Sequence, residues 1–397
     1  MDEVKDNYID LPTYKVIFMA LSVGVIVANM FYIQPIEPLI TSSYHISSST
    51  TAVLAMLVQV SYALGLLFLV PLGDAFNRYK FLQVMELISI IALLVAAIAP
   101  NFWIFGLAVI IIGLTSIGRQ IIIPYIAYLT PVKKQGPILG AMISGMLTGI
   151  LFARTFSGII ATVLGWHMVY GLAALINLIL VIFIHYWVPD DPRKITESKK
   201  YSEIIASLPR LFKKYKYLRG LSLNAFCMFG IANLFWSTLA FLLAKYYGYD
   251  SAVAGSMGLL GIVSIFAAPF IGRMVDKYSP RTNIQISWWF GVIAYIIFAI
   301  FTRSIYMLMI GIVILDLSTQ FSQVTNQAII QSLSRKSNSR NNSIFMFSYF
   351  LGGSLGTLIG IDVWGHFGWY GVIVSAVIFL AIALINYFWH GVPKKLK

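Results

Sequence analysis

The sequence predicts an all-α integral membrane protein in which twelve transmembrane helices form two pseudo-symmetric bundles of six. Composition is the first reason, because 59% of the 397 residues are hydrophobic, only 11% are charged, and the mean hydropathy is +0.83. Such a chain cannot present an ordinary water-soluble surface. The second reason is the spacing of its apolar runs, and the third is the distribution of its positive charges.

Twelve apolar runs are long enough to cross the roughly 30 Å hydrocarbon core of a bilayer, which takes about 20 helical residues. A β-barrel would show shorter segments of alternating polarity, whereas the stretch 90–99 contains no polar side chain. The first six runs cover 14–36, 50–72, 80–99, 102–128, 136–163 and 167–188; the last six cover 218–244, 252–275, 282–301, 305–330, 341–363 and 368–390.

The positive charges are distributed unevenly along this pattern. Of the 28 Lys and Arg residues, 24 lie at the two chain ends or in loops after even-numbered helices. Lys245 and Arg303 lie on the opposite side, and Arg119 and Arg154 lie inside predicted helices. Because positive charge collects on the cytoplasmic side, we expect a multi-pass plasma-membrane protein with both termini in the cytoplasm. The net charge of +13 then reflects topology and contact with the lipid bilayer, not nucleic acid.

A long polar stretch divides the chain into an N-terminal six-helix bundle at 1–189, a cytoplasmic linker at 190–219 and a C-terminal six-helix bundle at 220–397. The linker sequence also predicts an interfacial amphipathic helix. Matching features recur in the two halves: Asp74 and Asp276 lie 202 residues apart, and the similar stretches ANMFY and ANLFW lie 204 apart. We interpret this as an internal repeat, which secondary transporters use to build a site between two halves.

The turn after the eighth helix carries the residues that point to a family. Its sequence GRMVDKYSPR (272–281) resembles the G-x-x-x-D-[RK]-x-x-x-R signature of the major facilitator superfamily, and PLGDAFNRYK (71–80) is a degenerate first copy. The resemblance implies the major facilitator fold and transport by alternating access. It also implies a gating role at the cytoplasmic helix ends for Asp74, Arg78, Lys80, Gly272, Asp276, Lys277 and Arg281. The alternative is that these charges only set topology.

Further stretches resemble a poorly characterised prokaryotic branch of that superfamily, grouped near the drug:proton antiporters. They are QPIEP after the first helix, GLTSIGRQIIIPYIAYLTP in the fourth, SGMLTGILFARTFSG in the fifth and DLSTQFSQVTNQ in the tenth. The antiporter signature needs a Gly-Pro pair in the fifth helix, where Gly149 is followed by Ile150. The direction of transport therefore stays open at this point.

Charged residues inside the predicted helices need a partner or an aqueous cavity. Asp316 lies near the middle of the tenth helix and is the candidate for proton coupling, because a carboxyl group in a cavity that alternately wets and dries takes up and releases a proton. Substrate contact or a static ion pair with an arginine are the alternatives. Arg119 and Arg154 either hold an anionic group of the substrate together or fix helix packing.

Neutral polar and aromatic side chains complete the predicted substrate cavity. On the tenth helix, Asp316, Gln320, Gln323 and Gln327 share one face. The remaining candidates lie in helices one, two, four and seven: Asn29, Tyr32, Gln34, Gln59, Tyr62, Gln120, Asn233 and Trp236. Three other acids are given no such role: Glu37 and Asp362 are expected to reach water at outer helix ends, and Glu86 to pair with a loop arginine.

These observations lead to a secondary transporter, with proton-coupled export of a small amphiphilic organic compound as the main hypothesis. Uptake of a small organic anion, by symport or uniport, is the alternative, and a channel or receptor is the non-transporter alternative. The five histidines lie near predicted interfaces, with no catalytic cluster and no metal spacing, so an enzyme is not expected. We expect no cofactor other than a proton gradient, and an internal repeat makes a monomer sufficient.

Overall fold

The computed structural model describes residues 12–130, 132–188, 201–333 and 338–392, and within these ranges every regular element is helical. The first half of the chain contains α1 (Thr13–Ala28), η1 (Gln34–Ile36), α2 (Glu37–Ser43), α3 (Ser48–Leu64), η2 (Gly65–Leu69), α4 (Val70–Ala75), α5 (Arg78–Ala97), α6 (Phe102–Thr115), α7 (Gly118–Leu129), α8 (Val132–Leu164) and α9 (Trp166–Trp187). The second half contains α10 (Tyr201–Lys214), α11 (Lys216–Tyr247), α12 (Ser251–Ser256), η3 (Met257–Gly261), α13 (Ile262–Lys277), α14 (Pro280–Ile300), α15 (Ile305–Leu333) and α16 (Asn338–His390).

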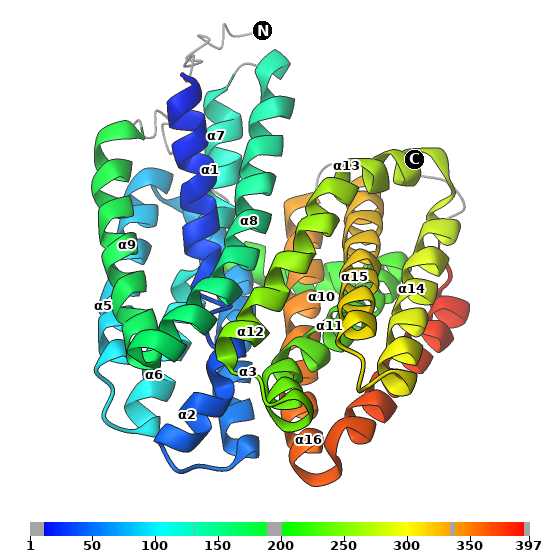
Figure 1. Ribbon diagram of the computed structural model, residues 1–397. Helices are drawn as coiled ribbons and strands as arrows, with labels where there is room; N and C mark the ends of the chain where they lie inside the picture. The colour runs from blue at the N-terminus through cyan, green and yellow to red at the C-terminus, as the bar shows by residue number, and fades with distance from the viewer. Residues whose placement is uncertain (1–11, 131, 189–200, 334–337, 393–397) are drawn as a thin grey trace, which may run out of the picture.

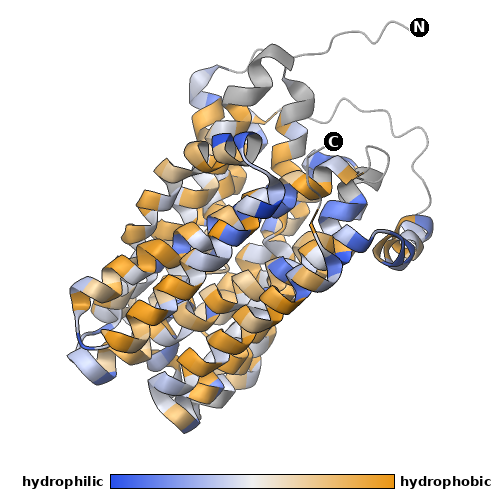
Figure 2. Cartoon of the chain, turned by 90° about the vertical axis from the view of Figure 1, so that its right-hand side faces the viewer, coloured by the Kyte–Doolittle hydropathy of each residue, from blue (hydrophilic) through white to orange (hydrophobic). Residues whose placement is uncertain are grey.

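Ten helical stretches in the described residues are long and apolar enough to cross a membrane. The last of them, 340–390, is interrupted at Gly368, whose φ of 65° is left-handed. The chain of α16 turns back at the lower edge of Figure 1. Large apolar side chains such as Trp103 and Phe388 are exposed on the outside of the helices, where lipid would cover them. Figure 2 shows hydrophobic residues along the bodies of the helices.

Two predicted continuous helices are broken in the structure, which corrects the sequence prediction. The first helix ends at Ala28 and resumes only at η1 and α2, where Pro35 lacks the N–H that a regular helix needs. The fourth is divided into α6 and α7 at Ser116, whose hydroxyl donates to the Ile112 carbonyl oxygen (2.7 Å) at the end of α6. Both breaks lie inside the predicted spans, next to polar residues.

Glycine contacts of the same kind recur in the two halves of the chain. A Cβ atom on Gly149 in α8 would collide with the backbone of Gly24 in α1, and one on Gly356 in α16 would collide with that of Gly230 in α11. Gly24 and Gly230 lie 206 residues apart in the sequence, and Gly149 and Gly356 lie 207 residues apart. Small residues let two helix backbones touch, so the same kind of glycine contact packs α1 against α8 and α11 against α16.

The two halves meet along α3 and α16 and along α8 and α12, and the latter pair crosses in the lower half of Figure 1. There the Thr155 hydroxyl donates to the Gly255 carbonyl oxygen at 3.1 Å, and a Cβ on Gly158 would collide with the Ser251 carbonyl. We call the side on which α1 begins at Thr13 the terminal side, and the opposite side, where α16 reverses at Gly368, the loop side. The contact between α8 and α12 lies toward the loop side.

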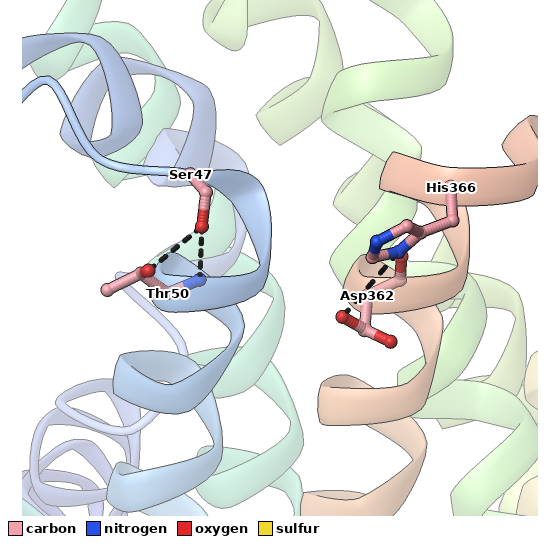
Figure 3. Close-up of polar contacts among 4 residues, drawn as sticks. All are labelled: Ser47, Thr50, Asp362 and His366. Atoms are coloured by element: carbon pink, nitrogen blue, oxygen red, sulfur yellow. Dashed lines mark hydrogen bonds and ion pairs between the residues drawn. The ribbon is translucent and has the colours of Figure 1, made fainter.

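The N-termini of three helices on the loop side are capped by short polar side chains. The Ser47 side chain accepts a hydrogen bond from the Thr50 backbone N–H at 3.2 Å and lies 2.9 Å from the Thr50 hydroxyl, at the start of α3 (Figure 3). Asn101 and Asp250 cap α6 and α12 in the same way. These caps satisfy backbone donors that the first turn of a helix leaves unpaired.

Candidate functional site

A cavity with about 110 Å³ of room for water lies between the two halves. Its wall comes from α1, α7, α8, α11, η3, α13, α15 and α16, so both halves contribute. Seven of the predicted site residues line it: Arg119, Arg154, Asn233, Trp236, Asp316, Gln320 and Gln323. The rest of the wall is largely apolar or aromatic, including Met30, Phe31, Met146, Phe229 and Phe350.

Asp316, Trp236 and Arg154 form one contact cluster on this wall. The indole Nε1 of Trp236 donates to Oδ1 of Asp316 at 3.2 Å, and the guanidinium carbon of Arg154 lies 3.8 Å from the centroid of a Trp236 ring. Arg154 also donates from Nε to Oε1 of Gln34 at 3.0 Å. No carboxylate among the described residues lies within 4.0 Å of Arg154, so the indole separates the cation from Asp316. The direct ion pair considered as an alternative is not formed.

Arg119 is held by a different set of contacts. Its Nε donates to the Tyr62 hydroxyl at 2.6 Å, and one terminal nitrogen lies 2.7 Å from the Met146 sulfur. The guanidinium also faces the Phe350 ring, 5.7 Å from its centroid. The side chain is only 5% exposed, yet no acidic partner contacts it in the described part of the chain. Arg119 therefore presents a positive charge to the cavity that only neutral and aromatic groups stabilise.

Gln34, Gln59 and Asn233 belong to a hydrogen-bond network that joins the two halves on the loop side of the cavity. Gln59 Nε2 donates to Asn233 Oδ1 at 2.9 Å and to the Thr357 hydroxyl at 3.0 Å. Gln34 Nε2 donates to the same Asn233 oxygen at 3.2 Å. We call these four side chains the cross-half network, and all of them are buried. The network ties the two halves together in the loop-side part of the cavity wall, to which Asn233 itself belongs.

The predicted polar face of α15 divides at its last member. Asp316, Gln320 and Gln323 line the cavity, and Gln323 accepts a hydrogen bond from the Tyr349 hydroxyl at 3.3 Å. Gln327, one turn further, instead donates to Asn342 of α16 at 3.3 Å. The cavity wall therefore ends between Gln323 and Gln327.

Three more predicted cavity residues lie away from its wall. Asn29 and Asn177 of α9 exchange hydrogen bonds inside the first half, at 3.3 and 3.2 Å. Tyr32 packs on Phe156, with ring centroids 5.8 Å apart. Gln120 is partly buried in α7 and its backbone N–H bonds to Ile117. Val27, Met30 and Phe31 of the same segment line the cavity, at the spacing of one helix face, and Asn29 and Tyr32 lie off that face.

The predicted gating residues lie in or beside the turns on the terminal side. Arg281 donates from Nε to the Val392 carbonyl oxygen at 3.0 Å, while Lys80 and Lys277 are exposed. Arg78 is the first residue of α5. The surroundings of Asp74, Gly272 and Asp276 lie outside the described part of the structure.

Several wall residues were not among the sequence-predicted candidates. Met146 and Phe350 contact Arg119, and Tyr349 stacks on Phe229 with ring centroids 3.9 Å apart. Apolar and aromatic residues are too common in membrane helices for composition to single these out. Thr357 in the cross-half network was missed because one threonine among many gives no signal.

Of the three remaining acids, two have surroundings that differ from the prediction. The side chain of Asp362 is 48% exposed, so it reaches water as expected, and it lies 3.8 Å from Nδ1 of His366 (Figure 3). Glu37 and Glu86 are instead fully buried, and none of their carboxyl oxygens has a hydrogen-bond partner among the described residues. The prediction that Glu37 reaches water is therefore wrong, and so is the prediction that Glu86 pairs with a loop arginine.

No group of three or more His, Cys, Asp or Glu side chains suited to a metal is found in the described ranges. A family model of the Major Facilitator Superfamily matches residues 19–357 and 221–397. The chain belongs to the major facilitator superfamily. Within it, the sequence is 31% identical to the "Uncharacterized transporter YgaY" of Escherichia coli O157:H7, over 98% of each chain, and 27% identical to the "Probable transporter SCO4007" of Streptomyces coelicolor, over 92% of this chain and 84% of that one.

Solved structures show the same fold at low sequence identity. A bacterial homolog of the human lysosomal transporter Spinster, inward-facing and unoccupied, matches with a TM-score of 0.78 and 16% identity over 98% of both chains. A D-xylose-proton symporter matches with a TM-score of 0.74 and 14% identity, over 96% of this chain and 98% of that one. The chain is thus a multi-pass membrane protein of a transporter family, and these likenesses concern its fold.

Proposed function

We propose that the protein is a secondary active transporter that carries a small amphiphilic organic compound by alternating access and exports it in exchange for protons. The observation that carries the proposal is a cavity between two halves that holds Asp316, Arg154 and Arg119 within largely apolar walls. Such a site fits a compound with one polar or charged end and an apolar body. The proton gradient is the energy source, and neither a cofactor nor a catalytic step is required.

The proposed architecture has twelve spanning helices in two bundles, at 1–189 and 220–397, joined by the linker 190–219. Two features of the structure support the count: the stretch 340–390 divides at Gly368, and α12, η3 and α13 run together over 251–277. The recurring glycine contacts support the repeat. One monomer therefore contains a complete transport pathway.

The proposed orientation places the terminal side in the cytoplasm of a cell whose plasma membrane holds the protein. It rests on the positive charges, which concentrate on that side. The cross-half network and the contact between α8 and α12 both lie on the loop side. With this orientation the structure corresponds to a state closed toward the outside, and the gating turns with Asp74, Asp276 and their basic neighbours would close the cytoplasmic side in the other state.

Asp316 is the proposed proton-coupling residue. It is partly buried, lines the cavity, and within the described part of the chain accepts a hydrogen bond from the Trp236 indole alone. A substrate cation or a proton can therefore neutralise it in turn, which is the requirement for exchange. Export as the direction of transport rests on the resemblance to the branch near the drug:proton antiporters.

A second candidate function is uptake of a small organic anion. Arg119 favours it, because none of the described carboxylates pairs with its guanidinium, which is therefore suited to bind one from a substrate. A channel or a receptor is a third possibility, and flux measurements separate them: a channel passes voltage-driven current, and a receptor binds without flux.

The test uses purified protein in vesicles with an internal pH dye, to which amphiphilic cations and organic acids are added in turn. For the wild type we expect proton movement with at least one compound, and for Asp316→Asn we expect that movement to be lost. Asp362→Asn is the matched control, since Asp362 is an exposed acid outside the cavity. Labelled flux without proton movement in the wild type would instead identify a uniporter or another coupling ion. Equal proton movement by wild type and Asp316→Asn would remove Asp316 from the mechanism.

A further inference from the structure

Glu86 is a carboxyl group that the proposed transport cycle does not use. It lies in α5, is fully buried, and has no hydrogen-bond partner for either oxygen in the described residues. An acid at the centre of a membrane helix costs about 2.5 to 3.5 kcal/mol on insertion scales, and an isolated buried carboxylate is costly in any apolar surrounding. Its charge must therefore be neutralised in this conformation by something other than a neighbouring side chain.

Glu86 lies against the break between α6 and α7. A Cβ atom on Gly118, the first residue of α7, would lie 2.7 Å from Oε1 of Glu86. The same Cβ would lie 3.1 Å from the tip of Ile26 in α1, so three helices enclose the carboxyl group. Glycine at this position is what allows the acid to approach the start of α7 so closely.

A break of this kind supplies the polar groups that an ion site needs. The last carbonyl oxygens of α6 and the first N–H groups of α7 have no partners within their own helices. Thr115 and Ser116 donate to Ile111 and Ile112 at 2.8 and 2.7 Å, which leaves their hydroxyl lone pairs available. Unwound segments with half-helix ends bind Na⁺ or protons in other membrane transporters.

Among the described side chains, no charged group on the neighbouring helices pairs with the Glu86 carboxyl group. Arg119 follows Gly118, but its guanidinium contacts Tyr62 and Met146 in the cavity. The other described titratable side chains on the packed helices include Tyr125 of α7, which is buried, and those that follow. On α9, His185 bonds Tyr79 at 3.1 Å, and Tyr170 packs among Phe105 and Trp166; α6 contains no titratable residue, and Tyr14 and Lys15 of α1 lie in its first turn.

We propose that Glu86 binds a monovalent cation, a proton or Na⁺, at the break between α6 and α7. Both ions neutralise the carboxylate, and a proton does so by forming its O–H bond. Because α7 also carries Arg119, a shift of α7 that opens the cavity moves Gly118 away from Glu86 and admits water to the carboxyl group. Cation release is then linked to the position of a helix that contacts substrate. This site is separate from Asp316, and the proposal does not depend on the role of Asp316.

The test measures the thermal stability of the purified full-length protein in detergent, without any substrate. Stability is recorded over a pH series, and at fixed pH with Na⁺ replacing K⁺ at constant ionic strength. With a proton as the ligand, wild-type stability falls as pH rises, by up to about tenfold in the unfolding equilibrium constant per pH unit, since the buried carboxylate is then uncompensated. With Na⁺ as the ligand, Na⁺ raises the melting temperature in a concentration-dependent way and K⁺ does not.

Glu86→Gln is an uncharged replacement of similar shape and should abolish a Na⁺ dependence, or reduce the pH dependence by the part that Glu86 supplies, while Glu37, also buried without a partner in the described residues, keeps its own part. Glu86→Asp keeps the carboxyl group and should retain it, which guards against a variant that merely folds poorly. Ser89→Ala is the matched control, because Ser89 is also buried on α5 and its hydroxyl also lacks a partner in the described residues. A wild type insensitive to both pH and Na⁺, or a Glu86→Gln protein with the wild-type response, overturns the proposal. Loss of proton movement in Asp316→Asn alone leaves it unaffected.

Discussion

The cross-half network allows a quantitative test of which side of the cavity is closed. Gln59 donates two hydrogen bonds across the halves, to Asn233 and Thr357 at 2.9 and 3.0 Å. Interhelical hydrogen bonds in membranes contribute about 0.6 kcal/mol each, so Gln59→Ala should cost the closed state about 1.2 kcal/mol. That corresponds to an increase of about eightfold in the ratio of loop-side-open to loop-side-closed molecules, with RT near 0.59 kcal/mol.

The assay is the rate at which a membrane-impermeant thiol reagent labels Ala240→Cys from the loop side. Ala240 is buried beside Gln34 and Trp236, and the only native cysteine, Cys227, is replaced by serine to give a silent background. Gln59→Ala should raise the labelling rate about eightfold, as the population shift requires. Thr51→Ala is the control, since Thr51 lies on the same helix and bonds Thr41 within the first half at 2.7 Å. An unchanged rate in Gln59→Ala would show that the network does not hold the loop side closed.

Three further predictions address packing, the site and a helix cap. Gly149→Ala should lower stability by about 1–3 kcal/mol because its methyl group meets backbone, whereas Gly140→Ala, with nothing within 4 Å, should not; thermal unfolding compares them. Trp236→Phe keeps a ring under the neighbouring guanidinium but removes the donor to Asp316, so substrate binding should persist while the pH profile of transport shifts; an unchanged profile contradicts this role. Ser47→Ala should cost about 1 kcal/mol of stability through loss of its cap, with transport kinetics unaltered.

The helical membrane fold was predictable because lipid imposes strong rules on composition and run length. Apolar runs near 20 residues identify spans without knowledge of any contact, and ten such stretches are found in the described structure. The breaks were not predictable from the same rules. Hydropathy averages over Asn29–Gln34 and over Ser116, so it cannot register a turn of a few residues inside an apolar run. The division between α6 and α7 could be seen only in the backbone of the structure.

The candidate site shows the same limit at the level of side chains. Asp316, Arg119 and Arg154 were identifiable because charge inside a span is rare, and the structure brings all three to one cavity. Asn29 was grouped with them on polarity alone, but it bonds Asn177 inside the first half. Glu86 was assigned a loop arginine because sequence shows depth along a helix but not the direction of the side chain. Which polar residues meet is set by helix rotation and packing.

The linker helix α10 contacts both halves on the terminal side. The Tyr201 hydroxyl donates to the Phe68 carbonyl oxygen at 3.0 Å, and Arg340 of α16 donates to the Ser207 hydroxyl at 2.9 Å. These anchors lie at the two ends of roughly two helical turns, about 9 Å of rigid rod. If the halves rock apart there, one anchor must detach or the rod must tilt. The helix therefore acts as a strut of fixed length, and a peptide or modification that displaced it would alter how far the two halves can separate without touching the cavity.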